Sequence, residues 1–347
     1  MTDIAATFTR LDLDLLGVLR RETATPNLTF EGPTTRLTGG YWADLVAFRL
    51  HGAPPGWQGD LVARVMPDAG IAAKETILQG EAAAQGFATP AVHLAGGADD
   101  GLGRPFMVMD RVHGRPLLAD LNGAGAIAAL PKLARRLPDV LAGALAELHR
   151  LDPAPVRERL SAGSSAGFGV AELLSSLRSA AEICRRADLV AAADWLTEHP
   201  AGPAPEVVCH GDLHPFNVLV DGHGAVTVLD WSAGRLAPGL HDVAFTGLVL
   251  SEPPLVAPRA LRPVIRAAGR FLARRFRRSY AGQTGATLNP ASLRWHEGVI
   301  CLRALVEVAG WAAGGRLDDY TGHPWMISGS AFAARLTRLT GIAVTPR

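Results

Sequence analysis

Three residues that could bind and activate a phosphorylated substrate lie within one short stretch of the chain. Asp212 follows a short apolar run, Asn217 comes five residues later, and Asp230 ends a further apolar run. Carboxylate and amide oxygens are the ligands that Mg²⁺ prefers, and a carboxylate can accept the proton of an attacking hydroxyl. The pattern therefore predicts phosphoryl transfer, with Asp212 as the catalytic base and Asn217 and Asp230 as the metal ligands.

The elements around these residues must bring them together. Apolar runs alternate with turn-forming residues such as Asp-Gly-His-Gly at 221–224, which predicts a hairpin with the three side chains at one end. His210 and His214 have the spacing of two metal ligands on a helix. Gly211 and Pro215 oppose a helix there. We therefore assign His210 to the catalytic loop, where it supports the loop rather than titrates.

Two segments carry a family resemblance. HGDLHPFN at 210–217, followed by VLDWS at 228–232, resembles the aminoglycoside phosphotransferase and choline kinase family, small-molecule relatives of the protein kinases. The protein-kinase catalytic loop has an Asp, four further residues and an Asn, with a metal-binding Asp downstream, and all three match here. The family commonly has Gly where this chain has Phe216, a difference that removes no ligand. The resemblance extends over roughly residues 30–320.

The resemblance implies an α+β, bilobal protein-kinase-like fold. The N-lobe, residues 1–112, would contain a leading helix, a five-stranded antiparallel sheet with a helix, and a hinge at 110–112. The C-lobe, residues 113–347, would be mostly helical and carry the catalytic loop 210–217, the metal-binding Asp230 and the acceptor pocket. Apolar residues at helical spacing near the N-terminus agree with the leading helix.

The same resemblance assigns the nucleotide contacts. Gly39 and Gly40 would let backbone amides approach the phosphates. Arg64 stands in the strand where protein kinases place the Lys that holds the α- and β-phosphates, and its planar fork can bind phosphate as well. Glu75, early in the next helix, is the expected ion-pair partner of Arg64, with Glu81 as the alternative.

At the hinge, the backbone near Met109, Asp110 and Val112 would meet the adenine. The implied cofactors are ATP, with GTP possible, and Mg²⁺. The acceptor would be a small molecule with a hydroxyl group. An aminoglycoside is a polycation and needs a pocket rich in carboxylates; a macrolide, a sugar or an amino alcohol also remains possible.

Further residues have supporting roles in this interpretation. Asp242 is expected to brace the catalytic loop, and His149 to be structural. The acceptor pocket is expected to draw on a helical segment with four candidates: Trp295, His296, Glu297 and Glu307. An arginine stripe with four-residue spacing is interpreted as a solvated basic face; it comprises Arg262, Arg266, Arg270 and Arg274.

Composition limits the remaining classes. The 347 residues have a formal net charge of +1, which gives no global drive toward nucleic acid or membrane. The three cysteines are far apart and form no CxxC pair, which disfavours a disulfide framework or a zinc site. From the sequence we expect neither a signal peptide nor a membrane-spanning run. We therefore expect a cytoplasmic protein with no evident obligate protein partner.

Two other classes of protein could share parts of this pattern. A non-catalytic nucleotide-binding pseudokinase would normally have lost Asp212 or Asp230. A hydrolase could use the GxSxG match at 163–167, but no apolar strand precedes that match. A P-loop kinase is excluded more firmly, because neither Lys74 nor Lys132 stands in a GxxxxGK[ST] motif.

Overall fold

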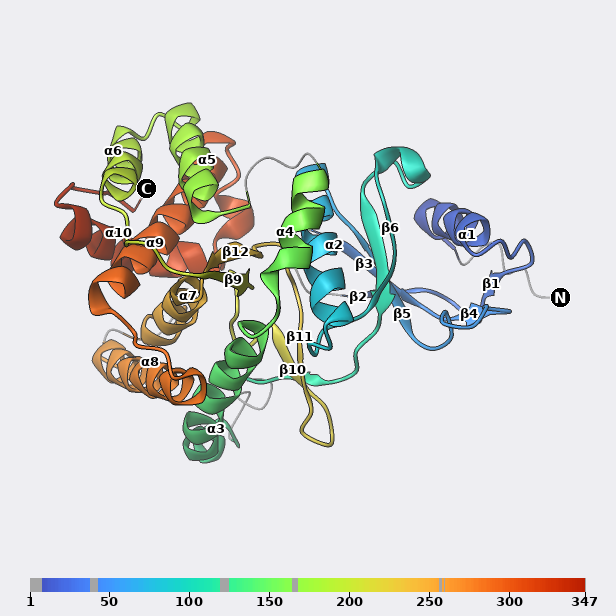
Figure 1. The fold of residues 1–347 in the computed structure, drawn as a ribbon, viewed down its shortest axis with the longest axis horizontal. Coiled ribbons are helices and arrows are strands. Elements are labelled where there is room, and N and C mark those ends of the chain that lie inside the picture. Colours follow the sequence, from blue (N-terminus) through green and yellow to red (C-terminus); the bar gives the residue numbers. More distant parts are fainter. Residues whose placement is uncertain are drawn as a thin grey trace. The chain divides into compact units, whose positions relative to one another are not determined.

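The computed structural model describes residues 8–37, 43–118, 125–163, 168–255, 258 and 260–346. The chain forms two compact units (Figure 1). The first comprises Met1–Arg115, Glu158–Ser165 and Leu219–Ser232, and the second comprises Pro116–Arg157, Ala166–Val218 and Ala233–Arg347. Each unit is a set of segments that pack closely together. The boundary expected between the N-lobe and the C-lobe after residue 112 therefore stays a prediction.

The first unit is built on a five-stranded antiparallel sheet with the order β2-β3-β5-β7-β6. Arg64 in the central strand lies opposite Leu45 on one side and Met107 on the other. The predicted five-stranded sheet is thus confirmed. Its strands are β2 (Thr35–Leu37), β3 (Asp44–Phe48), β5 (Leu61–Val65), β6 (Val92–Gly96) and β7 (Phe106–Asp110).

Helices cover both faces of this sheet. The leading helix α1 (Arg10–Glu22) packs in one core cluster with Phe106 and Val108. The second helix, α2 (Ala69–Ala84), packs on the other face with Met107. Because side chains alternate along a strand, Arg64 lies on the α2 side of β5. A short pair, β1 (Thr29–Phe30) and β4 (Leu50–His51), and the 3₁₀ turn η2 (Ala98–Asp100) complete the first part of the chain.

The second unit is mostly helical, as expected. Helix α9 (Pro290–Ala313) contacts α5, α6, α7 and α10 (Figure 1). The remaining helices are α3 (Gly125–Leu148), α5 (Val170–Ile183), α6 (Ala187–Glu198), α7 (Leu240–Ser251), α8 (Arg262–Thr284), η4 (Asp318–Tyr320) and α10 (Pro324–Thr340). The residues of α4 (Pro153–Ala162) are divided between the units.

Short strands flank the catalytic loop 210–217. β9 (Glu206–Cys209) pairs antiparallel with β12 (Arg235–Pro238), which places Arg235 opposite Cys209. β10 (Val218–Val220) and β11 (Val226–Val228) join β8 (Arg115–Pro116) in a three-stranded sheet. The predicted turn between β10 and β11 is held by Asp221, whose carboxylate accepts hydrogen bonds from two following backbone N–H groups.

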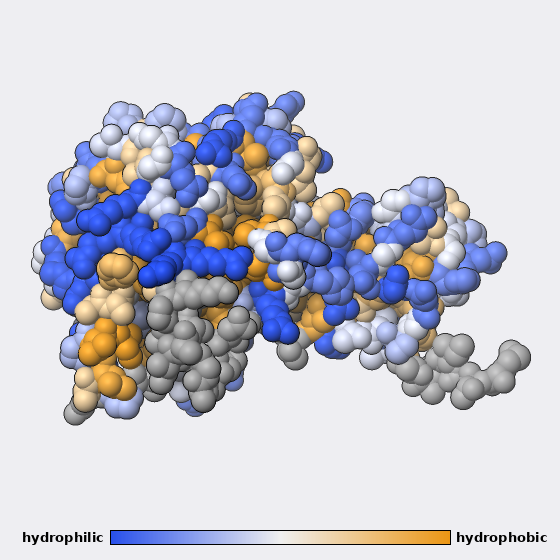
Figure 2. Space-filling model, turned by 90° about the horizontal axis from the view of Figure 1, so that it is seen from below, coloured by the Kyte–Doolittle hydropathy of each residue, from blue (hydrophilic) through white to orange (hydrophobic). Residues whose placement is uncertain are grey.

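The surface agrees with the expectation of a solvated basic face. The four arginines of the stripe on α8 are exposed. Figure 2 shows hydrophobic residues scattered among hydrophilic ones on one face of the molecule. Within the described part of the chain, no helix is both long and apolar enough to cross a membrane.

Candidate active site

A buried carboxylate on the first turn of α7 holds the start of the catalytic loop. Asp242 is fully buried, and its two oxygens accept the backbone N–H groups of His210 at 2.8 Å and Gly211 at 2.6 Å. His149 lies 3.1 Å from the same carboxylate. Burial alone would raise the pKa of Asp242, but the hydrogen bond and charge of His149 lower the pKa to about 2. The expected brace is therefore present, and it is an anion.

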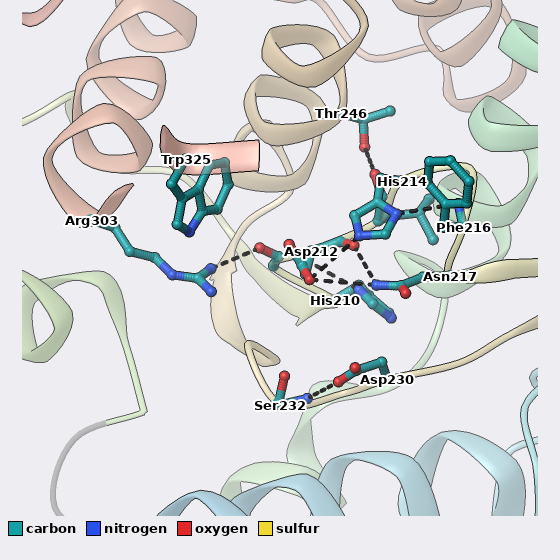
Figure 3. Close-up of polar contacts among 12 residues, drawn as sticks. His210, Asp212, His214, Phe216, Asn217, Asp230, Ser232, Thr246, Arg303 and Trp325 are labelled. Carbon is teal, nitrogen blue, oxygen red and sulfur yellow. Dashed lines mark hydrogen bonds and ion pairs between the residues drawn. The ribbon is translucent and has the colours of Figure 1, made fainter. Parts of the chain in front are cut away.

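Helices α7 and α9 fix the loop further. Thr246 of α7 donates its hydroxyl to the carbonyl of Leu213 at 2.8 Å. Arg303 of α9 donates from Nη1 to the carbonyl of Gly211 at 3.2 Å. In Figure 3, Arg303 approaches Asp212 from one side and Asn217 from the other. The backbone on both sides of Asp212 is thus tied to rigid helices.

The loop also requires a glycine at position 211. Gly211 has a φ of +73°, in the left-handed region. A Cβ atom on this residue would lie 2.3 Å from the carbonyl oxygen of Ala233. The bare Cα therefore allows the loop to pack directly against the segment that leads into β12.

Asp212 and Asn217 are joined within the loop. The Asn217 side-chain nitrogen donates to the carbonyl of Asp212 at 3.0 Å and lies 3.4 Å from its Oδ2. Within the described chain the amide oxygen of Asn217 makes no hydrogen bond, so a hard oxygen donor remains for a cation. His210 Nδ1 accepts the backbone N–H of Asp212 at 3.3 Å, which agrees with a supporting role.

Asp230 belongs to the first unit and is anchored by its neighbours. It has a φ of +65°, uncommon for a residue other than Gly, and its Oδ1 accepts the N–H of Ser232 at 3.3 Å (Figure 3). Trp231 is fully buried and donates from Nε1 to the hydroxyl of Thr89 at 2.9 Å. That hydroxyl in turn donates to the carbonyl of Val228. The neighbours of Asp230 on both sides, Val228 and Trp231, are thereby anchored through Thr89, which holds the backbone of Asp230 in its uncommon conformation.

The predicted ion pair between Arg64 and Glu75 is present. Arg64 Nε lies 3.1 Å from Glu75 Oε1, and Nη2 lies 3.3 Å from Asp230 Oδ1. Glu75 is almost fully buried, and this burial raises its pKa to about 7 against the lowering effect of Arg64. Glu81, the alternative partner, pairs with Arg159 instead.

The hinge residues differ in whether their backbone N–H groups are already hydrogen-bonded. The N–H of Asp110 donates to the carbonyl of Ala91, and its carboxylate pairs with His93. Met109 lies in β7, and its sulfur accepts a hydrogen bond from the side-chain nitrogen of Gln79. Among the described residues, the N–H of Val112 has no acceptor, so it is available to a base. Gly39 and Gly40, the predicted phosphate contacts, lie outside the described residues.

The four candidates for the acceptor pocket have different partners. Trp295 donates to the carbonyl of Leu196, and Glu297 is bound by two arginines, so both side chains contribute to packing of the second unit. Glu307 differs, because it accepts from Arg303 Nε and from Trp325 Nε1, both at 2.9 Å. Through Arg303 it reaches the catalytic loop. Sequence reasoning missed Arg303, although its spacing of four from Glu307 on a helix was a usable signal.

One buried cluster has the residue types of a metal site. Atoms of His149, Cys209 and Asp242 lie within 4.8 Å of one another. However, both oxygens of Asp242 already bind loop N–H groups, and His149 Nδ1 is 2.7 Å from the Tyr280 hydroxyl. Burial also raises the pKa of the Cys209 thiol well above its ordinary value, which opposes the thiolate a metal needs. We assign this cluster to loop support.

A family model described as the phosphotransferase enzyme family (APH) matches residues 35–286, most of the chain. The chain belongs to this family. The predicted recognition is thus confirmed, and so is the predicted class, a small-molecule kinase. A curated relative in the fungus Ampulloclitocybe clavipes, protein Y of the clavilactone A biosynthesis cluster, is 32% identical over 140 residues. This match covers 38% of the chain and 32% of that relative.

Solved structures of phosphotransferases share the fold. A thermostable mutant of APH(4)-Ia in complex with ADP and hygromycin B is 19% identical, with a TM-score of 0.55 over 88% of this chain and 97% of that one. Macrolide 2′-phosphotransferase type I is 16% identical, with a TM-score of 0.57 over 90% and 98%. The GDP and kanamycin complex of APH(2″)-IIIa is 17% identical, with a TM-score of 0.57 over 95% and 99%. These similarities confirm the predicted kinase-like fold.

Proposed function

We propose that this phosphotransferase moves the γ-phosphoryl group of ATP, or of GTP, to a hydroxyl of a small molecule. The observation that carries the proposal is the catalytic loop, in which a buried anion, two helices and Asn217 all hold the segment around Asp212. Positioning of this kind is the main contribution of a protein to phosphoryl transfer. The acceptor class from the sequence stays open: aminoglycoside-like, macrolide, sugar or amino alcohol.

In this proposal each residue has one task. Asp212 accepts the proton of the acceptor hydroxyl. At the same time the oxygen of that hydroxyl bonds to the γ-phosphorus, and the bond from the γ-phosphorus to the β,γ-bridging oxygen breaks. His210 keeps the loop in shape. Asn217 and Asp230 hold Mg²⁺, whose charge, when bound, neutralises the phosphate oxygens. Both side chains offer hard oxygen donors, which fits this ion.

The nucleotide would be held by the first unit. Arg64, kept in place by Glu75, supplies a guanidinium for the phosphates. The free N–H of Val112 is the proposed donor to the base, with Met109 and Asp110 beside it. Gly39 and Gly40 remain the proposed backbone contacts to the phosphates.

Thermal unfolding with ATP or GTP, with and without Mg²⁺, tests the nucleotide site. A ligand at about 100 times its dissociation constant adds about 2.7 kcal/mol to the free energy of unfolding. We expect a Mg²⁺-dependent rise of the melting temperature that Asp230→Asn abolishes. A rise that ignores both Mg²⁺ and Asp230→Asn would favour a non-catalytic nucleotide-binding module, and no rise with either nucleotide would refute the proposal.

A further inference from the structure

Arg235 of β12 is a buried cation that forms no ion pair with the described residues. It is 6% exposed, and its Nε donates to the carbonyl of Ala233 at 3.2 Å. Its other N–H donors have no acceptor among the described residues, and no carboxylate of those residues lies within 4 Å. In contrast, Arg277 and Arg335 each have a carboxylate oxygen within 2.7 Å. The terminal nitrogens of Arg235 are not among the fully buried polar atoms that lack a partner, so they keep some contact with solvent, where they can donate to a ligand.

The position of Arg235 relates this missing partner to the catalytic loop. The Ala233 carbonyl that accepts from Arg235 is the one against which Gly211 packs, because a Cβ there would lie 2.3 Å from that oxygen. Arg303 donates to the carbonyl of Gly211 itself. Arg303 therefore binds Gly211, the residue directly before Asp212, and Arg235 is linked to it through the carbonyl of Ala233.

The charge of Asp242 raises the pKa of Arg235, but within the described chain no carboxylate forms an ion pair with Arg235. Asp242 is committed to the loop N–H groups, and Glu307 to Arg303 and Trp325. The Nδ1 atoms of the buried His241 and His296 make no hydrogen bond within the described chain. Burial, followed by repulsion from Arg303, lowers the pKa of Arg235 to about 10, so it stays charged at neutral pH. Burial likewise lowers the pKa of His296 to about 4, so this ring is neutral.

We infer that Arg235, together with Arg303, forms an anion subsite of the acceptor pocket, and that the acceptor is a small hydroxyl compound with a carboxylate or phosphate group. The inference rests on the proposed function, because Asp212 must meet the hydroxyl of the same molecule. The planar fork of a guanidinium binds both anions through two parallel hydrogen bonds. A polycationic aminoglycoside would instead leave Arg235 unpaired and add repulsion.

Small anions can test the subsite even though the acceptor is not identified. The full chain, saturated with Mg²⁺ and ADP, is unfolded thermally while chloride is replaced by acetate or phosphate at constant ionic strength. Mg²⁺ and ADP alone should already raise the melting temperature, and this rise tests the nucleotide site separately from the subsite. We expect one of the anions to raise the melting temperature, with an apparent dissociation constant about 10- to 100-fold weaker in Arg235→Met, as for loss of hydrogen bonds to a charged group.

Two arginine variants serve as controls for that measurement. Arg270→Met removes an exposed charge from α8 and should respond to anions as the wild type does. Arg277→Met breaks a buried ion pair and should lower the melting temperature, whereas Arg235→Met without anions should keep or raise it. Equal anion responses in wild type and Arg235→Met would overturn the inference, as would a loss of stability in Arg235→Met comparable to that in Arg277→Met.

Matched acceptor pairs then identify the anion. Transfer from labelled ATP is measured with gluconate against glucose, and with glycerol 3-phosphate against glycerol. The inference expects a preference for the charged member, and a loss of about 10-fold or more in its kcat/KM in Arg235→Met, with the neutral member unchanged. A preference for the neutral member, or for kanamycin, in a chain that binds Mg²⁺ and ATP normally would overturn the subsite and leave the proposed function standing.

Discussion

Asp242→Asn should separate loop support from nucleotide binding. The substitution keeps the shape of the side chain but replaces one accepting oxygen by an NH₂ group, which then faces a backbone N–H of the loop. Losing a hydrogen bond to a charged group in a buried site, and leaving its donor unpaired, costs about 3 kcal/mol. At roughly 2–4 °C per kcal/mol for a unit of this size, the melting temperature should fall by about 6–12 °C.

Asp139→Asn is the matched control. Asp139 also pairs with an arginine, at 2.7 Å, but both side chains are well exposed, so its loss should cost less than about 1 kcal/mol. A nucleotide-dependent shift should remain in Asp242→Asn, because all the proposed nucleotide contacts except the Mg²⁺ ligand Asn217 lie in the first unit, while transfer to an acceptor falls. Differential scanning calorimetry and a coupled ADP-release assay report the two effects. If Asp242→Asn melts within about 2 °C of Asp139→Asn, the loop is not held by this carboxylate.

Two further substitutions test the loop backbone and the buried ion pair. Gly211→Ala should lower both stability and turnover, because its Cβ would meet the Ala233 carbonyl. As a control, Gly282→Ala, in open space on α8, should be neutral or slightly stabilising. Similar melting temperatures for the two variants would contradict this. The pKa of Glu75 is raised from 4.5 to about 7, so the folded protein keeps a proton that the unfolded chain has lost between these values. The free energy of unfolding from urea titrations should therefore fall, by at most about 3 kcal/mol, as pH rises through that window in wild type but not in Glu75→Gln. An identical pH slope in both would show that Glu75 titrates normally.

The sequence predicts well the features that depend on local pattern. The strands of the first unit follow from short apolar runs with turns between them. Alternation of side chains along β5 then places Arg64 on the face covered by α2, where Glu75 can reach it. The family resemblance supplied the five-stranded antiparallel sheet and the role of Asp242, which no local pattern contains.

Features that depend on distant neighbours could not be predicted. Helix α9 is enclosed by four other helices, so it has no single apolar stripe to indicate which side faces the catalytic loop. Which of the four pocket candidates face the acceptor therefore stays a prediction, and Arg303 was missed. The lack of an ion pair at Arg235 is likewise invisible in the sequence, because it depends on where distant carboxylates lie in the fold.

The rate of phosphoryl transfer by Asp212→Ala tests the central claim most directly. Transfer of labelled γ-phosphate from ATP is measured at saturating Mg²⁺ and ATP, with the dissociation constant of the nucleotide determined on the same samples. A positioned base contributes about 100-fold or more to turnover, so the variant should lose at least that factor and bind nucleotide within about threefold of wild type. Undiminished turnover in Asp212→Ala would show that this carboxylate is not the catalytic base and would contradict the account.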